Sequence, residues 1–449
     1  MNEFNYELLS LFCLLVFLIS LSDFSFFWGG AVLLITGLIY MSFIGDSSWH
    51  SEMWAFDHWR QFVKGLLLLS SLGVWYLTDR KGIDTFLLLF FTVLASLTLV
   101  SCNHLLMIYL SLELQTFCLF ILISKNRNSM LSTEAGLKYF ILGAISSGVY
   151  LLGVSLHYGM NLGFNLNDFI WTENSPFSDV INGLILISLF FKLTVVPFHF
   201  WAPDVYEGAS TETVVLIATL PKISVLTVVI HLGFLSHLLT LAAVACMVFG
   251  TLGALNQTKI KRLMAYSGIS HVGFMLMGVL LGNNHGIQAA YVYMIIYVLM
   301  VILTFTIVLH SPLKKSLIVE FSGLHKENST LALSWAIILL SIAGIPPLAG
   351  FISKWLVLWA AFNFKFYFLT LIAIVCSMIA GGYYLRILKM IYFQRRSNVL
   401  IWETILSPVQ PIPSSSSYLI SFGTYGLLFM ILNPTPWVLI SHWGSLYLY

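Results

Sequence analysis

The sequence has little charge of either sign. Only 9% of its 449 residues are charged, 59% are hydrophobic, and the mean hydropathy is +0.91, whereas a soluble domain carries roughly 25% charged residues. The formal net charge of +2 is too small to predict a nucleic-acid partner. This scarcity of charge excludes an ordinary soluble domain and indicates an integral membrane protein.

Cysteine is also scarce, and its spacing matches no metal site. The five cysteines include no CxxC pair and form no cluster with histidine at metal-ligand spacing. No glycine-rich phosphate loop follows an expected strand, so the sequence predicts no nucleotide site. We therefore expect no metal and no cofactor on this chain. The cysteines are Cys13, Cys102, Cys118, Cys246 and Cys376.

Long apolar runs are abundant. Runs of about 17–25 residues recur from end to end, each able to cross a hydrocarbon core of about 30 Å as a helix. Hydropathy predicts an all-α protein of about 14 transmembrane helices in one membrane domain, residues 1–449. With Glu3, Glu7 and no basic N-terminal segment, the first run is expected to be a retained helix. The helices are expected near 8–22, 26–44, 62–77, 84–101, 104–124, 137–158, 181–198, 213–233, 236–255, 263–282, 287–309, 331–360, 366–388 and 417–432.

The order of lysines and prolines predicts two inverted halves. Lys192 lies five residues before Pro197, whereas Lys354 lies seven to eight residues after Pro347 and Pro346. These segments are five helices apart and cross the membrane in opposite directions, so the reversed order matches. Broken helices at corresponding positions indicate a transport site near the midplane. We expect helices one to three in 1–82, a first half in 84–233, an inverted second half in 236–393, a C-terminal loop and last helix in 394–449, and helix breaks at Pro197, Pro221, Pro346 and Pro347.

Basic residues gather in the loops of one side. They follow odd-numbered helices, as at Lys125 and Arg127 or at Lys259 and Arg262. By the positive-inside rule these loops face the cytoplasm or matrix, and both termini face the other side. The acidic segment Asp204–Glu212 lies on the basic side against this trend.

Four ionisable residues are expected near mid-depth: Glu113, Lys192, Lys222 and Lys354. Each costs about 2.5–3.5 kcal/mol on insertion scales, so a partner or internal water must compensate it. A lysine held in this way is easily switched between protonation states. The set therefore predicts a proton pathway. The alternative is a set of helix-packing ion pairs or side chains that extend to an interface.

Three further residues are candidates for a proton relay: Lys138, His199 and His271. A histidine at the end of a membrane helix is more often a hydrogen-bonded cap or packing residue than a relay. Lys138 lies near the start of its expected helix and could equally anchor that helix at the interface.

The segments that carry these residues resemble a known family. The strings FKLTVVPFHFWAPDVYEG, LPKISVL, LGALNQTKIKRLMAYSGISHVGF and SIAGIPPLAGFISKW resemble chain 2 of proton-pumping NADH:ubiquinone oxidoreductase, respiratory complex I. Chain 2 is the smallest of the three antiporter-like subunits of that complex. The resemblance covers roughly residues 104–393. It implies an antiporter-like fold with broken helices and a part in proton translocation coupled to electron transfer from NADH to ubiquinone.

The resemblance also implies roles for single residues. Glu113 would pair with Lys192 and tune its proton affinity. Lys222 would be the central lysine on a broken helix, and Lys354 would lie toward the exit side. The two histidines match residues of the family's hydrated axis, and the relay lysine matches a helix-six lysine. One departure is the string ASTETV, where the family usually has a proline; it adds Glu212 near the expected proton entrance.

Partners and location are implied in the same way. NADH, FMN, iron–sulfur clusters and ubiquinone are expected on partner subunits. The expected partners are other membrane-arm subunits, including another antiporter-like subunit and small core membrane subunits, with lipids such as cardiolipin. The expected location is the mitochondrial inner membrane, with a bacterial plasma membrane as the alternative. Two rival functions stay open: a subunit of a multi-subunit cation/proton antiporter, and a structural subunit whose pump has decayed.

Overall fold

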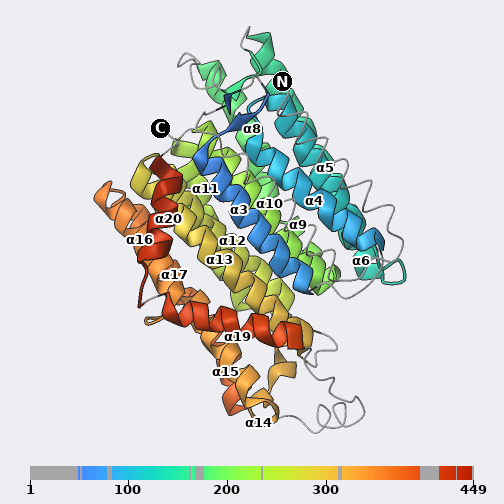
Figure 1. Ribbon diagram of the computed structural model, residues 1–449, viewed down its shortest axis with the longest axis vertical. Coiled ribbons are helices and arrows are strands. Elements are labelled where there is room, and N and C mark those ends of the chain that lie inside the picture. The colour runs from blue at the N-terminus through green and yellow to red at the C-terminus, as the bar shows by residue number, and fades with distance from the viewer. Residues whose placement is uncertain are drawn as a thin grey trace.

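The protein is a bundle of long helices that lie side by side (Figure 1). The computed structural model describes residues 49–50, 53–77, 83–160, 163–166, 176–233, 236–311, 316–394, 414–430 and 432–446. Within these ranges, eight helices are long and apolar enough to cross a membrane. The only strands in the same ranges are β1 (Trp49–His50) and β2 (Ala55–Phe56), which pair antiparallel. The helices expected near 8–22 and 26–44 lie outside the described residues.

The first group of helices surrounds one central helix, α10. Every residue in the apolar window of α10 is buried by its neighbours. A polar side chain on this helix therefore faces protein and not lipid, and it needs an internal partner. The group consists of α3 (His58–Leu77), α4 (Ile83–Ser101), α5 (Leu105–Ile123), α6 (Met130–Gly159), α8 (Pro176–Leu193), α9 (Trp201–Gly208) and α10 (Thr211–Leu232).

The second group packs against the first through α12 and α13, which are also largely buried. Helix α13 contacts α10, and α12 contacts α9. The group consists of α11 (Ser236–Leu255), α12 (Ile260–Leu280), α13 (Asn284–His310), the short η1 (Ile318–Phe321) and α14 (Leu324–Glu327), α15 (Ser329–Ala343), α16 (Ala349–Asn363) and α17 (Tyr367–Phe393).

Two divided helices, α8 with α9 and α15 with α16, each consist of two pieces separated by an irregular segment. The second pair replaces the single helix expected near 331–360, whereas α9 lies beyond the helix expected near 181–198. Helix α8 ends at Leu193, and α9 starts only at Trp201; α15 ends before Gly344, and α16 starts after residue 348. The residue after each first piece is left-handed: φ is 63° at Thr194 and 80° at Gly344. Proline cannot donate the backbone hydrogen bond that would continue the helix. The irregular segments contain Pro197 in the first break and Pro346 and Pro347 in the second.

The break expected at Pro221 is wrong. Helix α10 runs without interruption from Thr211 to Leu232 with this proline inside it. Neighbouring helices bury every residue in the apolar window of α10, Pro221 included. Such protein contacts let a membrane helix continue through a proline.

The C-terminal part contains two helices where we expected one near 417–432. They are α19 (Ser414–Phe429) and α20 (Thr435–Leu446), and Pro434 lies between them. Helix α19 has only 16 residues and lies across the direction of the bundle in Figure 1. Helix α20 packs against α13, where Gln288 donates to the Val438 carbonyl at 3.0 Å. The physical reason for the difference is the proline, which favours a new helix start over continuation.

Gly350 keeps the two pieces of the second divided helix in close contact. A Cβ atom at this position of α16 would overlap the carbonyl oxygen of Ser341 in α15. We expect Gly350→Ala to lower the free energy of unfolding by about 1–3 kcal/mol, because an overfilled contact forces the backbone apart. Thermal unfolding of the full chain in detergent measures this loss.

The matched control is Gly381→Ala in α17, where a Cβ atom meets nothing within 4 Å. It should leave the melting temperature unchanged or raise it slightly, since alanine favours a helix over glycine. Equal melting temperatures for the two variants would contradict the close contact.

Candidate functional site

Five polar side chains from five different helices extend through the interior. Glu113 lies on α5, Lys192 on α8, Lys222 on α10, His271 on α12 and Lys354 on α16. The lysines are 9%, 4% and 6% exposed in this order, and the histidine is 5% exposed. Their polar ends therefore do not extend to the surface of the bundle, which removes the interface alternative for the three lysines.

The amino group of Lys192 has no hydrogen-bond partner among the described residues. It lies in the last turn of α8, against Gly143 of α6 and within electrostatic reach of Glu113. Glu113 is half-buried, and its carboxylate accepts from Thr116 at 3.5 Å. A buried ammonium without a partner is unfavourable unless water solvates it or it gives up its proton. Lys192 is therefore a buried cation whose electrostatic compensation among the described residues comes from Glu113.

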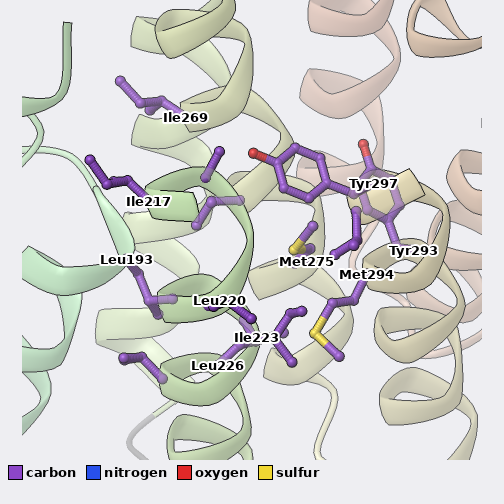
Figure 2. Close-up of a cluster of buried hydrophobic side chains, with 14 of the residues drawn as sticks. Leu193, Ile217, Leu220, Ile223, Leu226, Ile269, Met275, Tyr293, Met294 and Tyr297 are labelled. Carbon is purple, nitrogen blue, oxygen red and sulfur yellow. The ribbon is translucent and has the colours of Figure 1, made fainter. Parts of the chain in front are cut away.

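Lys222 has one specific partner. Its amino group donates to the hydroxyl of Tyr297 on α13 at 2.9 Å and lies 5.1 Å from the centre of that ring. Figure 2 shows Tyr297 among buried apolar side chains of α10 and α12. Gly268 of α12 leaves room for this pair, since a Cβ atom there would lie 3.1 Å from the amino group. The pair is thus a polar contact inside an apolar core.

His271 lies between the central lysine and the lysine on α16. Its Nδ1 atom is 2.6 Å from the hydroxyl of Tyr293, and its ring is 5.5 Å from that of Tyr297. It is within electrostatic reach of both Lys222 and Lys354. The histidine therefore has a tyrosine hydroxyl as its hydrogen-bond partner and two lysines within electrostatic reach.

The second helix break supplies the partner of Lys354. The amino group donates to the carbonyl of Ala343 at 2.8 Å and lies 5.6 Å from the ring centre of Phe274. Ala343 is the last residue of α15, whose final carbonyls carry the negative end of the helix dipole. A break in the helix thus creates an acceptor for a buried cation.

A small cavity opens beside the central lysine. Its wall comes from α9, α10, α12, α13 and α15 and includes Tyr206, Ser267, His271, Tyr297 and Thr304. It is large enough for at least one water molecule, and its wall offers the polar partners that a buried water needs. Water here would join the side chains on either side of it.

Some residues of the site were not singled out in the sequence. Cys246 of α11 accepts from the backbone amide of Val196 in the first break at 3.2 Å and lies within electrostatic reach of Lys222. An isolated cysteine gives no signal of this position. Tyr293 and Tyr297 did give one, because hydroxyls four residues apart in an apolar run lie on one helix face.

The remaining relay candidates lie elsewhere. His199 is in the irregular segment after α8, with its Nδ1 atom buried and its ring 4.6 Å from that of Phe200. Lys138 is 40% exposed and lies 2.7 Å from both Glu134 and Asp204. The structure thus places Lys138 in an ion network at the basic end, as an anchor would be, and not beside the other lysines.

This network also accounts for the acidic segment on the basic side. Asp204 contacts Lys138 and Arg262 at 2.7 Å each, while Glu207 contacts Arg262 at 3.1 Å and pairs with Lys259. The pairs connect α6, α9 and the start of α12. Burial opposes ionisation of Asp204, but the two cations outweigh it and hold the pKa of its carboxyl group below the ordinary value.

The departure from the family string does not disturb the start of α10. The helix begins at Thr211, and the Thr213 hydroxyl donates to the carbonyl of Ser210 at 2.9 Å. Glu212 lies in the first turn, where a negative charge favours the helix.

Asp204→Asn should weaken the contact between α6, α9 and α12 by about 1 kcal/mol at pH 7, because both ion pairs are partly exposed. The folded-state pKa lies below the unfolded value of about 3.9, so the stabilisation is present above pH 4 and is lost as pH falls through the folded pKa. Thermal unfolding at pH 7 and at pH 3 measures both effects. The control is Asp179→Asn at the exposed start of α8, and equal stability of both variants at pH 7 would contradict the network.

Tyr297→Phe should lower the free energy of unfolding by about 1–3 kcal/mol, because it leaves the Lys222 amino group buried without its acceptor. The control is Tyr291→Phe on the same helix, since the buried Tyr291 hydroxyl has no hydrogen-bond partner among the described residues. Thermal unfolding of the full chain distinguishes the two. A loss as large for Tyr291→Phe would show that the lysine contact is not the cause.

Comparison with known proteins identifies the family of the chain. A family model described as NADH:quinone oxidoreductase/Mrp antiporter, TM, matches residues 102–380. NADH-ubiquinone oxidoreductase chain 2 of Metridium senile is 44% identical over 378 residues, which are 82% of this chain and 98% of that protein.

Solved structures share the fold. A chain of respiratory complex I from Thermus thermophilus with bound aureothin superimposes with a TM-score of 0.81 at 29% identity, covering 90% of this chain and 91% of that one. A chain of the Mrp complex from Dietzia sp. has a TM-score of 0.82 at 18% identity, covering 94% and 92%, and this likeness concerns the fold alone. The expected antiporter-like membrane fold is confirmed, and the chain belongs to the NADH:quinone oxidoreductase/Mrp antiporter transmembrane family.

Proposed function

We propose that the chain is a membrane-arm subunit of a proton-pumping NADH:ubiquinone oxidoreductase and that protons cross it along its buried polar side chains. The observation that carries the proposal is the burial of His271 within electrostatic reach of both Lys222 and Lys354. Lys222 donates to Tyr297, whose ring lies 5.5 Å from that of His271. The likeness to chain 2 of Metridium senile, over nearly the whole of that protein, supports the assignment to this complex.

The proton enters from the basic side and first reaches Lys192. Redox chemistry in partner subunits changes the charge near Glu113, which lies within electrostatic reach of this lysine. The unpartnered amino group then takes up or gives up a proton, because little else compensates its charge. The first step is thus electrostatic and needs no redox group on this chain.

The later steps pass through the two tyrosine-linked groups. Tyr297 holds the Lys222 amino group, and Tyr293 holds the His271 ring, so both donors and acceptors have fixed directions. Water in the adjoining cavity carries the proton between them. Lys354 receives it beside the end of α15 and releases it toward the opposite side.

Partners supply what this chain does not carry. NADH, FMN, iron–sulfur clusters and ubiquinone are assigned to partner subunits, and the nearest partners are another antiporter-like subunit and small core membrane subunits. The membrane is the mitochondrial inner membrane, or the plasma membrane if the chain is bacterial. A stand-alone cation/proton antiporter is the alternative, and its support is a shared fold at 18% identity.

The test is Lys222→Ala in the assembled complex. We expect fewer protons moved per NADH oxidised, because the central link between Lys192 and His271 is lost. The measurement is NADH-driven acidification in native membrane vesicles, in complexes that migrate with NADH dehydrogenase activity on a native gel.

The matched control is Lys389→Ala, an exposed lysine of α17. It should assemble and pump as the unaltered complex does. An unchanged stoichiometry for Lys222→Ala would favour the structural subunit, and exchange driven by an ion gradient without NADH would favour the antiporter.

A further inference from the structure

A second buried charged cluster lies at the end of the bundle opposite the ion network. Arg60 and Lys64 are four residues apart on α3, and each is only 1% exposed. The Nη1 atom of Arg60 donates to the carbonyls of Ala55 and Ser101 at 3.2 and 3.1 Å. Neither residue is among the four ionisable residues expected near mid-depth, and α3 precedes the part of the chain that the family model matches. The cluster is therefore separate from Lys192, Lys222 and Lys354, which together are called the lysine row.

The cluster connects α3 to α10 through a histidine. The Nη2 atom of Arg60 is 3.1 Å from the Nε2 atom of His231, and the ring of Trp59 stacks on the same imidazole at 5.5 Å. Arginine can only donate hydrogen bonds, so Nε2 must be the acceptor and the imidazole must be neutral. A proton on Nε2 would replace this hydrogen bond with two donors and two like charges in contact.

Other groups around His231 set the balance of charge. Asp57 lies 3.5 Å from the Nε atom of Arg60. Cys102, between α4 and α5, is within electrostatic reach of Arg60 and Lys64, and burial raises the pKa of its thiol to about 12, so it stays neutral. Tyr291 of α13 is also within reach of Arg60. Arg60 therefore contacts the imidazole directly, Asp57 pairs with Arg60, and Lys64 lies one turn further along the same helix.

A cavity reaches this contact. Its wall includes Trp59, Arg60, Cys102, Thr227 and His231. Because α10 begins at the basic end and finishes here, this cavity lies toward the outer side of the membrane by the positive-inside rule. The acceptor nitrogen in the cavity wall is Nε2 of His231. A cavity this small has room for a proton carried by water from the outer compartment, and Nε2 can bind that proton.

We infer that His231 is an outward-facing proton-binding site, separate from the lysine row, whose protonation displaces Arg60 and loosens α3 from α10. The inference goes beyond the proposed function and does not depend on it. The consequence is mechanical, since α10 also carries Lys222, nine residues or roughly 14 Å away along the helix. A lower pH outside the membrane would thereby loosen α10, the helix that carries Lys222.

Hydrogen–deuterium exchange of the full chain in lipid nanodiscs tests the site. Between pH 8 and pH 5.5, with intrinsic rates corrected, protection of residues 53–64 and 225–233 should fall by about tenfold or more, as expected for loss of a hydrogen bond to a charged group. The interval spans the ordinary histidine pKa of about 6.5. In His231→Gln the side-chain oxygen still accepts from Arg60 but binds no proton, so protection should not change with pH.

The control is His237→Gln, an exposed histidine at the start of α11, which should respond to pH as the unaltered chain does. Unchanged protection of the unaltered chain at pH 5.5 would overturn the inference without any variant. The same pH response in His231→Gln would also overturn it. Neither result bears on proton transport through Lys222, because pumping is not the quantity measured.

Discussion

The burial of positive charge in a helical membrane bundle is the constraint on which the rest of the structure depends. A lysine at mid-depth is stable only if polar groups of the protein or water replace the solvent it has lost. Each of the three lysines meets this need differently. Lys222 has a tyrosine hydroxyl, and Lys354 has the last carbonyl of a broken helix. Within the described part of the chain, Lys192 has no hydrogen-bond partner and feels the electrostatic influence of Glu113. The differences give the three groups different responses to a nearby change of charge.

In the two divided helices, the lysine lies on opposite sides of the break along the chain. In the first, Lys192 precedes the break and sits at the end of α8. In the second, Lys354 follows the break, and its amino group turns back to the end of α15. The order of lysine and break is therefore reversed between the two divided helices, as the sequence had predicted from Lys192, Pro197, Pro347 and Lys354. The apolar packing around α10 then separates the polar groups, so that movement of charge between them depends on short links and water.

The sequence was a good guide where one residue decides the structure alone. Lysines in apolar runs and prolines at Pro197 and Pro347 are such cases, since charge in hydrocarbon and a missing backbone donor have strong local effects. Pro221 shows the limit, because surrounding helices stabilise α10 through it. Cys246 matters only through the break that packs against it, which no local pattern encodes.

Arg60 and Lys64 were missed for a related reason. They lie near the start of a helix, where long cationic side chains usually extend to the interface. Only the packing of α3 against α4, α10 and α13 turns them inward. The sequence gives the type and position of each residue. The direction in which each side chain points depends on tertiary contacts, which the sequence alone does not reveal.

The central claim is that internal water joins the buried lysines into one proton path. The most direct measurement is a cryo-electron microscopy map of the complex in its native membrane lipids at a resolution that shows ordered water. The account predicts water bound to the Lys192 amino group and a hydrogen-bonded chain of water and side chains linking Lys222, His271 and Lys354. A dry apolar layer between these groups, with Lys192 bound to protein atoms only, would contradict it.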